Sequence, residues 1–428
     1  MQLTCRGSIG VALASATASL LSATPTHAVD KVQNWQVDSA FYVYSEKDRV
    51  NVVEPAAQAK REIADDEFVT VTLVADAMTG ASPNGASPAA KPQTFTATSG
   101  NVSYSTPANT LPVHTFEDLR GAVAVDWDKP LSRLSRVLVG GSFSQEFDYT
   151  SMGASATYSR DSEDKFTTFS LGAALGLDFV QAKGGAPEPF SLLGNGATRT
   201  SRDDDDDEGN ADIKNKTIVD VVAGVTQVMT PRWLTQFNIG LGLTQGYLSD
   251  PYKMISLIDP ANGDTFNYRA EKRPDSRFRQ TFYTKTAYHF SKDTAHVSYR
   301  YYADNWGLRA HTADLKYRLE LGARHYLQPH LRYYHQDEAN FFHHNLVGLT
   351  LPTDNASADL RLATMSSYTL GLKYGFPLGK RHELSARVEH MRQQGESHPN
   401  SAIGSQKSQD FFPKLRVWMA QIGYSFEF

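Results

Sequence analysis

The sequence predicts an all-β fold, a single antiparallel transmembrane β-barrel of roughly 16 strands, with about 14 as the alternative count. Three features carry this prediction. Segments of about ten to fifteen residues alternate between apolar residues and polar or small ones, short turns and long polar loops separate these segments, and the chain ends in an alternating segment with a terminal Phe. After Val29, no window approaches the ~18 apolar residues that a spanning helix requires.

The composition excludes several classes of function. The 428-residue chain has a formal net charge of −5, which leaves no basic footprint for nucleic acid. Its one cysteine, Cys5, lies in a segment that we expect to be removed, so the mature chain offers no thiolate nucleophile and no thiolate metal ligand. No cofactor is implied.

The N-terminus has the three parts of an export signal. Arg6 supplies the positive charge, Ile9–Leu21 is a short apolar stretch diluted with Ser and Thr, and Thr26-His27-Ala28 fits the small-x-small cleavage rule. We therefore expect residues 1–28 to be a signal peptide. Residues 29–428 are expected to form the barrel, with long extracellular loops, in the outer membrane of a Gram-negative bacterium.

The clearest strand is predicted over His311–Leu327. Its odd positions, from Ala313 to Ala323, are apolar or small, whereas its even positions include the charged residues Asp314, Lys316, Arg318, Glu320 and Arg324. Charges at every second position cannot face the dry core of a sandwich, but they suit a water-filled lumen. Segments 165–180 and 233–248 repeat the alternation with small or polar residues on the lumen side.

The connections between strands alternate in length. Long polar loops over 181–214, 249–276, 340–362 and 395–411 are typical of the outside of the cell, and short turns are typical of the periplasmic side. The strand count is even only if Tyr149–Asp161 is a strand of its own, and residues 79–115 are hard to assign. The expected tight turns are Asp128–Ser132, Asp161–Lys165, Met229–Arg232, Ser291–Thr294, Leu327–Pro329 and Pro377–Arg381.

The last segment, Arg416–Phe428, indicates how the chain would reach its membrane. Tyr424, Phe426 and the terminal Phe428 are similar to the signal by which outer-membrane barrels are recognised for assembly. An ordinary amphipathic edge strand is the alternative interpretation. The expected partners are therefore the barrel assembly machinery and outer-membrane lipid, including lipopolysaccharide.

Charged residues predicted to face the lumen are the strongest functional indication. Rows of bases facing acids create a transverse field that orients polar solutes and sets ion preference. Such charges equally serve to crosslink the inner wall, and both interpretations stay open. The first predicts a porin-like channel for small polar or anionic solutes. The predicted set comprises Arg279, Lys285, Arg300, Lys316, Arg318, Arg324, Lys373 and Arg387, with Asp314 and Glu320 among the interleaved acids.

The segment Gly80–Pro88 supports an alternative function. It is rich in turn-forming residues, and by the parity of the turns it is expected on the periplasmic side. Its backbone N–H groups could meet an anion or a periplasmic, metal-handling partner, although a structural loop is the simpler interpretation. The alternative is thus a non-conducting barrel that binds such a partner through Gly80, Ser82, Pro83, Asn84 and Gly85.

Metal binding and catalysis have weaker support. Eight of the 13 histidines lie between His289 and His344, and His335, His343 and His344 could supply nitrogen ligands to Zn²⁺ or Cu²⁺. Lumen-lining histidine without metal is the simpler interpretation. The acidic run 203–208 could collect Ca²⁺, but runs of like charge usually stay solvated. No nucleophile elbow or zinc-protease motif is present, so no enzyme is predicted; an active site on the barrel wall is the third alternative.

Short segments spread over nearly the whole mature chain resemble a bacterial family of outer-membrane barrels known as a domain of unknown function. The most specific is GASPNGA (80–86) followed by QTFT (93–96). The resemblance implies the barrel fold and the outer membrane, and it implies no activity. Further matching segments are DRVNVVEP (48–55), GYLSDPYK (246–253), RPDSRFR (273–279), SYRYYADNWGLRAHT (298–312) and YLQPHLRYY (326–334).

Overall fold

The computed structural model describes residues 35–96, 103–193, 213–322, 324–350 and 354–428. The predicted signal peptide, residues 1–28, and the acidic run 203–208 lie outside these residues. The described residues confirm the predicted fold, because their wall strands form a closed antiparallel barrel of 16 strands. No helix among them is long and apolar enough to cross a membrane.

The barrel closes where its first and last strands meet. Strand β21 pairs with β1, from Glu427 opposite Gln36 to Val417 opposite Glu46. Each wall strand is therefore hydrogen-bonded on both sides, which leaves no open sheet edge. In hydrogen-bonding order, the wall consists of β1 (Trp35–Glu46), β2 (Val50–Ala64), β3 (Glu67–Pro83), β6 (Val113–Ser132), β7 (Ser135–Gln145), β8 (Tyr149–Asp161), β9 (Thr167–Val180), β10 (Lys214–Thr230), β11 (Trp233–Gly246), β14 (Ser276–His289), β15 (Thr294–Asp304), β16 (Arg309–Gly322), β17 (His325–Gln336), β19 (Met365–Pro377), β20 (His382–Gly395) and β21 (Leu415–Glu427).

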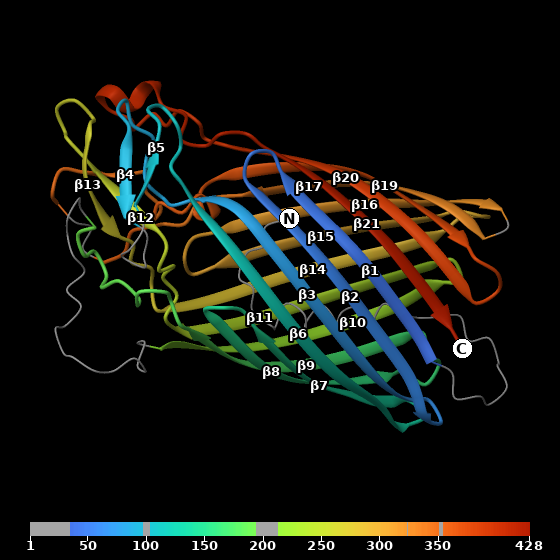
Figure 1. Ribbon diagram of the computed structural model, residues 1–428. Coiled ribbons are helices and arrows are strands. Elements are labelled where there is room, and N and C mark those ends of the chain that lie inside the picture. The colour runs from blue at the N-terminus through green and yellow to red at the C-terminus, as the bar shows by residue number, and fades with distance from the viewer. Residues whose placement is uncertain (1–34, 97–102, 194–212, 323, 351–353) are drawn as a thin grey trace.

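The two ends of the barrel differ. The short-turn end carries connections of two to five residues, together with Trp35 and Phe428, whose backbones bond to each other. The loop end lies opposite, to the left in Figure 1. It carries the long connections 84–112, 181–213, 247–275, 337–364 and 396–414.

The described parts of the long connections at the loop end fold into a structure that we call the cap. A sheet of β13 (Thr265–Ala270), β12 (Met254–Ile258) and β18 (Leu346–Val347) joins two loops, because β18 of one runs parallel to β12 of the other. The hairpin of β4 (Gln93–Thr96) and β5 (Ser103–Thr106) and the short 3-10 helices η1 (Leu360–Leu362) and η2 (Gly404–Ser408) complete the cap (Figure 1).

Apolar side chains hold the cap together. Ile255, Leu257 and Leu346 are buried in one cluster, and a second cluster includes Trp306 and Phe412. Burial of such side chains stabilises by roughly 1.5–3 kcal/mol each. The long loops are therefore packed against one another.

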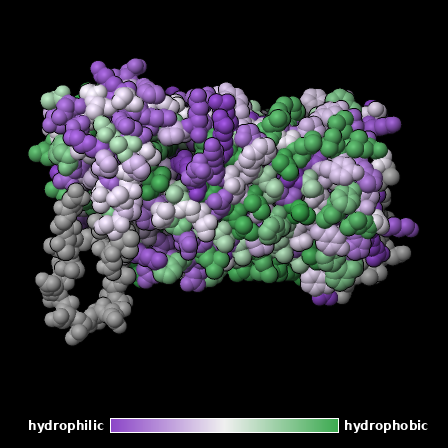
Figure 2. All heavy atoms as spheres, turned by 45° about the horizontal axis from the view of Figure 1, so that its top comes forward, coloured by the Kyte–Doolittle hydropathy of each residue, from purple (hydrophilic) through white to green (hydrophobic). Residues whose placement is uncertain are grey.

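In the wall, the ordinary polarity of a soluble β-protein is reversed. Along β9, the exposed Phe169, Leu171 and Leu175 point outward, whereas Ser170 and Asp178 are buried on the inner face. Figure 2 shows apolar residues over the barrel wall beside a mainly polar cap. An apolar outer face with a polar interior is the pattern that a bilayer selects.

Two expected turns are misplaced by a few residues, and both contain proline. The turn expected at Leu327–Pro329 lies before β17, which begins at His325, and Pro329 is inside that strand. The register between β17 and β16 passes from Leu327 directly to His330, so the missing N–H of proline falls where this ladder is interrupted. Similarly, β6 continues past Pro130, where the register shifts at a bulge.

A charge placed on the outer face tests the barrel's orientation in lipid. Ile239 lies near the middle of β11, and its side chain is 58% exposed. We expect Ile239→Arg to lower the free energy of unfolding in phospholipid vesicles by about 2–4 kcal/mol, since arginine at the bilayer midplane costs this much. Urea unfolding measures the change, with Ile239→Ala as the control. An Arg variant as stable as the Ala variant would show that this position faces water.

Candidate functional site

Strands β14 to β20 turn a row of charged side chains into the lumen. Exposed apolar residues such as Phe278, Val297 and Leu315 define their outer face, and the charged residues alternate with them. The structure places Arg279, Lys285, Arg300, Asp314, Lys316, Arg318, Glu320, Lys373 and Arg387 on the inner face.

Arg324 is placed elsewhere. The strand expected to run to Leu327 ends at Gly322, so Arg324 falls in the turn between β16 and β17 with a φ of 67°. Its guanidinium donates to the carbonyl oxygens of Gly379 and Lys380, at 3.0 and 2.9 Å, in the turn between β19 and β20. Arg324 therefore ties two turns together at the short-turn end and does not line the wall.

Some of the lumen charges are crosslinks that reach across an intervening strand. Arg279 of β14 bonds Asp220 of β10 at 3.0 Å, passing over Gly242 of β11. A side chain at Gly242 would overlap both partners. The glycine leaves the space in which the two long side chains meet.

A second crosslink of this kind centres on His330 of β17. Its Nε2 lies 2.7 Å from Asp314 of β16, and its Nδ1 lies 2.8 Å from Glu389 of β20. Glu389 reaches His330 over Gly371 of β19, which is registered between them. We call these three residues the His330 clamp.

Other lumen cations are not paired with an acid at ion-pair distance in the described part of the chain. Lys285, Arg300 and Lys373 make no ion pair with the described residues, although Lys373 lies 5.6 Å from the ring centre of Tyr326. By contrast, several other bases of the wall are paired with acids: Arg120 with Asp76, Arg136 with Asp128 and Lys216 with Asp178. These three bases lie on β14, β15 and β19.

Unpaired acids face this wall across the lumen. In a ring of 16 strands, each strand faces the one eight places along, so β2 faces β14 and β6 faces β16. Glu54 of β2 and Asp126 of β6 lie on the inner face, and within the described ranges neither forms a salt bridge. Acids on one side and bases on the other produce a field across the lumen.

The segment Gly80–Pro88 lies at the loop end, not at the short-turn end where the parity of the turns placed it. Residues 84–88 are buried beneath the cap. The Asn84 carbonyl accepts from Met254 N–H at 2.9 Å, and the Ser87 hydroxyl donates to the His344 carbonyl at 2.7 Å. The segment thus connects the loops of the cap, and its backbone is not presented to a partner.

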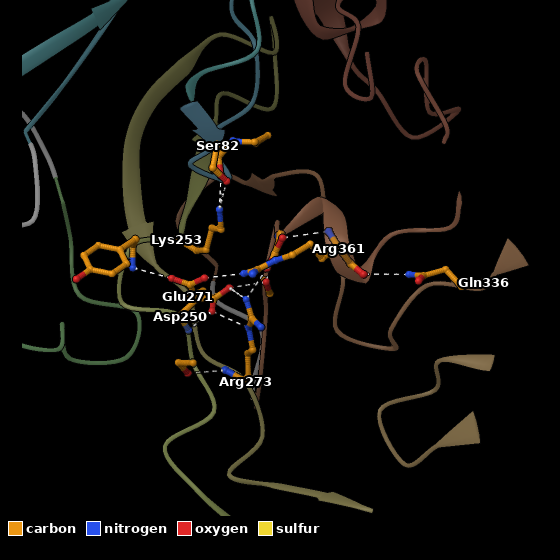
Figure 3. A network of polar contacts seen from close by, with 12 residues as sticks. Ser82, Asp250, Lys253, Glu271, Arg273, Gln336 and Arg361 are labelled. Carbon is orange, nitrogen blue, oxygen red and sulfur yellow. Dashed lines mark hydrogen bonds and ion pairs between the residues drawn. The ribbon is translucent and has the colours of Figure 1, made fainter. Parts of the chain in front are cut away.

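A network of ionised groups lies next to this segment (Figure 3). Arg273 donates to Glu271 at 3.1 Å and to Asp359 at 2.8 Å. Arg361 bonds both Asp359 and Asp250, the latter at 2.6 Å. Glu271 and Asp359 are almost fully buried, and the network joins loop 247–275 to loop 337–364.

A lysine connects the network to the barrel wall. Lys253 is buried and donates to the carbonyl of Pro83 and the hydroxyl of Ser82, at the end of β3. Burial lowers the pKa of Lys253, and Asp359 and Asp250 oppose this effect. Lys253 thus holds the loops onto the wall.

The carboxylates of the network are not equally stabilised. Burial by itself raises the pKa of Asp359, but Arg361, Lys253 and Arg273 outweigh it and hold this pKa far below its usual range. Burial prevails at Glu271, whose pKa is raised. Asp359 is therefore the carboxylate on which the network most depends.

The histidines singled out for metal binding are not brought together. Across the ranges that the structure describes, no group of three or more His, Cys, Asp or Glu side chains is arranged to hold a metal ion. The ring of His344 packs between Phe342 and Phe411, with centroids 4.9 and 5.0 Å away, and burial lowers its pKa to about 4. His335 contacts Ser366 instead.

The C-terminal aromatic residues lie on the outer face at the short-turn end. The ring centres of Tyr424 and Phe426 are 5.5 Å apart, and those of Phe426 and Phe428 are 5.6 Å apart. Their recognition by assembly machinery stays a prediction.

The comparisons with known proteins can now be added. A model of the family described as "Protein of unknown function (DUF3570)" matches residues 10–426. The chain belongs to this family. The resemblance drawn from GASPNGA and the other segments is thereby confirmed, and no curated protein matches the chain.

Solved structures are similar to this DUF3570 protein only weakly. The outer membrane protein OpdK from Pseudomonas aeruginosa shares 7% identity, with a TM-score of 0.39 and coverage of 93% of this chain and 99% of that one. OmpT of Vibrio cholerae shares 7% identity, with a TM-score of 0.38 and coverage of 94% of this chain and 99% of that one. A bacterial polysaccharide outer membrane secretin shares 8% identity, with a TM-score of 0.43 and coverage of 93% of this chain and 100% of that one. Nothing that these proteins bind or transport carries over to this chain.

Two glycines test whether Gly80–Pro88 supports the cap. Gly85 has a φ of 93°, and a Cβ there would overlap the Met254 carbonyl, whereas Gly185 has a φ of 77° and open space around it. Both alanine variants incur about 1 kcal/mol of backbone strain, but only Gly85→Ala should speed hydrogen exchange of Met254–Ile258. Equal exchange in the two variants would refute the role of Gly85.

The ion network predicts an acid-sensitive cap. A carboxyl group whose pKa is lowered by folding stabilises the folded state at any pH above its pKa in the unfolded chain, which is near 3.9. This stabilisation is lost progressively as the pH falls below about 4. Asp359→Asn should remove this contribution at neutral pH and destabilise the cap by roughly 3 kcal/mol, because Arg273 and Arg361 each lose the buried carboxylate that they share. Limited proteolysis between about pH 7 and pH 3 measures the effect.

The control for this experiment is Asp337→Asn, because the side chain of Asp337 is 57% exposed. The control should be cleaved like the wild type. Resistance of Asp359→Asn to protease at neutral pH would contradict the prediction.

Proposed function

We propose that this DUF3570 protein is an outer-membrane channel that conducts small polar solutes and prefers anions. The apolar outer face supports the membrane location, and the usual pattern of short periplasmic turns puts the loop end outside the cell. The observation that carries the channel proposal is the set of lumen cations that form no ion pair with the described residues: Lys285, Arg300 and Lys373.

The positions of these three bases in the lumen suit them to attract anions. Burying or confining a base without a counter-charge costs free energy, so bases kept unpaired on one wall indicate that mobile anions supply the counter-charge. Glu54 and Asp126 on the facing strands extend the field across the lumen. A hydrated anion would pass along β14, β15 and β19, and a cation along the opposite wall.

An occluded barrel that binds a partner is the second candidate. The packed cap at the loop end supports it, because a lid with two apolar clusters and a buried ion network opens with difficulty. In that case a partner would meet the exposed surface of the cap, since residues 84–88 are buried beneath it.

Single-channel recording in a planar bilayer distinguishes these functions. The refolded protein should give stepwise conductance, and its reversal potential in a salt gradient should show anion preference. Lys285→Glu should lower the anion-to-cation permeability ratio by about tenfold, because reversing a charge at close range changes ion energy by more than 1 kcal/mol.

The matched control is Lys292→Glu, in the exposed turn that follows the same strand. It should leave the ratio within about twofold of the wild type, since exposed charges are screened. A silent bilayer, with folding shown by heat-modifiable gel migration, would transfer the assignment to the occluded barrel.

A further inference from the structure

The hydrogen-bond geometry of the His330 clamp fixes the charge of its imidazole. A carboxylate can only accept hydrogen bonds, and a neutral imidazole has one donor and one acceptor nitrogen. Both nitrogens of His330 lie within 2.8 Å of carboxylate oxygens of Asp314 and Glu389. Both nitrogens must therefore carry hydrogen, which makes His330 an imidazolium.

The surroundings keep the two carboxylates ionised. Lys316 and Arg332 lie 3.9 and 4.0 Å from oxygens of Asp314, and Arg387 lies 3.9 Å from Glu389. Nearby cations favour the charged form of a carboxyl group. The proton is therefore held by the imidazole and not shared as a neutral carboxylic acid.

The clamp also decides which charges the lumen presents. Four cations and two carboxylates meet here, so the cluster has an excess of two positive charges while His330 is charged. The imidazolium holds both carboxylates at 2.7 and 2.8 Å, whereas Lys316, Arg332 and Arg387 stay 3.9 to 4.0 Å from them. A neutral imidazole could donate to only one carboxylate, and the other would turn to these cations.

We propose that His330 is a specificity-determining residue that makes the anion preference of the lumen depend on protonation. This inference rests on the proposed channel function. As pH rises and His330 loses its proton, one carboxylate is released and the anion preference falls. The metal alternative is not favoured, because the imidazole lies between the carboxylates and the three groups do not converge on one point.

Other charged or titratable groups face the clamp, and their contribution to the pH dependence must be distinguished from that of His330. Lysines and tyrosines among them lose protons at higher pH and would also reduce anion preference. A variant that removes only the His330 proton distinguishes the two contributions. These groups are Tyr283 and Lys285 on β14, His296 and Arg300 on β15, Lys373 on β19, and Tyr42 on β1.

The first test measures reversal potential from about pH 6 to about pH 10 in wild type and His330→Gln. Glutamine cannot take up the proton, so the variant should start with an anion-to-cation ratio about fivefold lower, the effect of one unit charge near 4 Å in water. The wild-type ratio should fall towards that of the variant as pH rises. Parallel pH curves for the two proteins would overturn the inference and leave the channel function standing.

A second variant breaks the clamp without changing any charge. A Cβ at Gly371 would lie 2.7 Å from Cγ of Glu389 and 2.8 Å from its Oε1, so Gly371→Ala should push Glu389 away from His330. The pH at which the ratio falls should then be lower than in wild type. The control is Gly240→Ala, another inner-face glycine, whose Cβ would make ordinary contacts, the nearest at 3.5 Å.

A third measurement does not require conductance. Nitrogen NMR of labelled histidine in refolded protein, assigned by His330→Gln, should show an imidazolium that persists above about pH 7. A neutral His330 at that pH would overturn the inference even if the protein conducts. A silent bilayer would instead overturn the proposed function, and the inference with it.

Discussion

Pairing of β1 with β21 is the interaction on which the rest of the structure depends. It joins residues from opposite ends of the chain and converts a sheet with two open edges into a ring. In lipid, an unpaired backbone N–H or C=O costs several kcal/mol, so a spanning sheet must close. Closure in turn gives each strand one face to the outside and one to a shared interior.

The interior then has to accommodate the polar side chains of all 16 strands. Two long-range ion pairs show how it does so, because Gly242 and Gly371 leave room for side chains of next-but-one strands to meet. Each pair crosslinks three or more strands of the ring. The two interpretations of the lumen charges, as a transverse field or as crosslinks of the wall, therefore apply to different residues. Arg279 is a crosslink, whereas Lys285 on the same strand forms no ion pair with the described residues.

The cap solves a different problem with the same kinds of interaction. Long loops lose much conformational entropy when they become ordered, and the cap offsets this loss with apolar clusters and with the network around Asp359. Ordering also fixes where the loops sit, since Lys253 ties them to the end of β3. The lumen charges and the cap thus rest on separate sets of contacts, the first within the wall and the second between loops.

The sequence by itself determined the fold class, because alternation with a period of two residues follows directly from strand geometry and is legible in each segment. It also indicated the family through segments such as GASPNGA and placed most lumen charges on one face, for example Lys285 and Lys316. It misassigned Arg324, because a two-residue turn beside alternating residues leaves no break in the pattern. It placed Gly80–Pro88 at the wrong end of the barrel, because the end assigned to a turn depends on how the neighbouring strands are divided and residues 79–115 are hard to assign.

Only the tertiary structure decided which charges are paired. The His330 clamp joins Asp314, His330 and Glu389 through the register of β16, β17, β19 and β20. Register is fixed by turn lengths and by the closure of the whole ring, and no local pattern in the sequence records it. The same holds for the ion network, whose residues come from two loops that are far apart in the chain and meet only because the barrel brings their ends together.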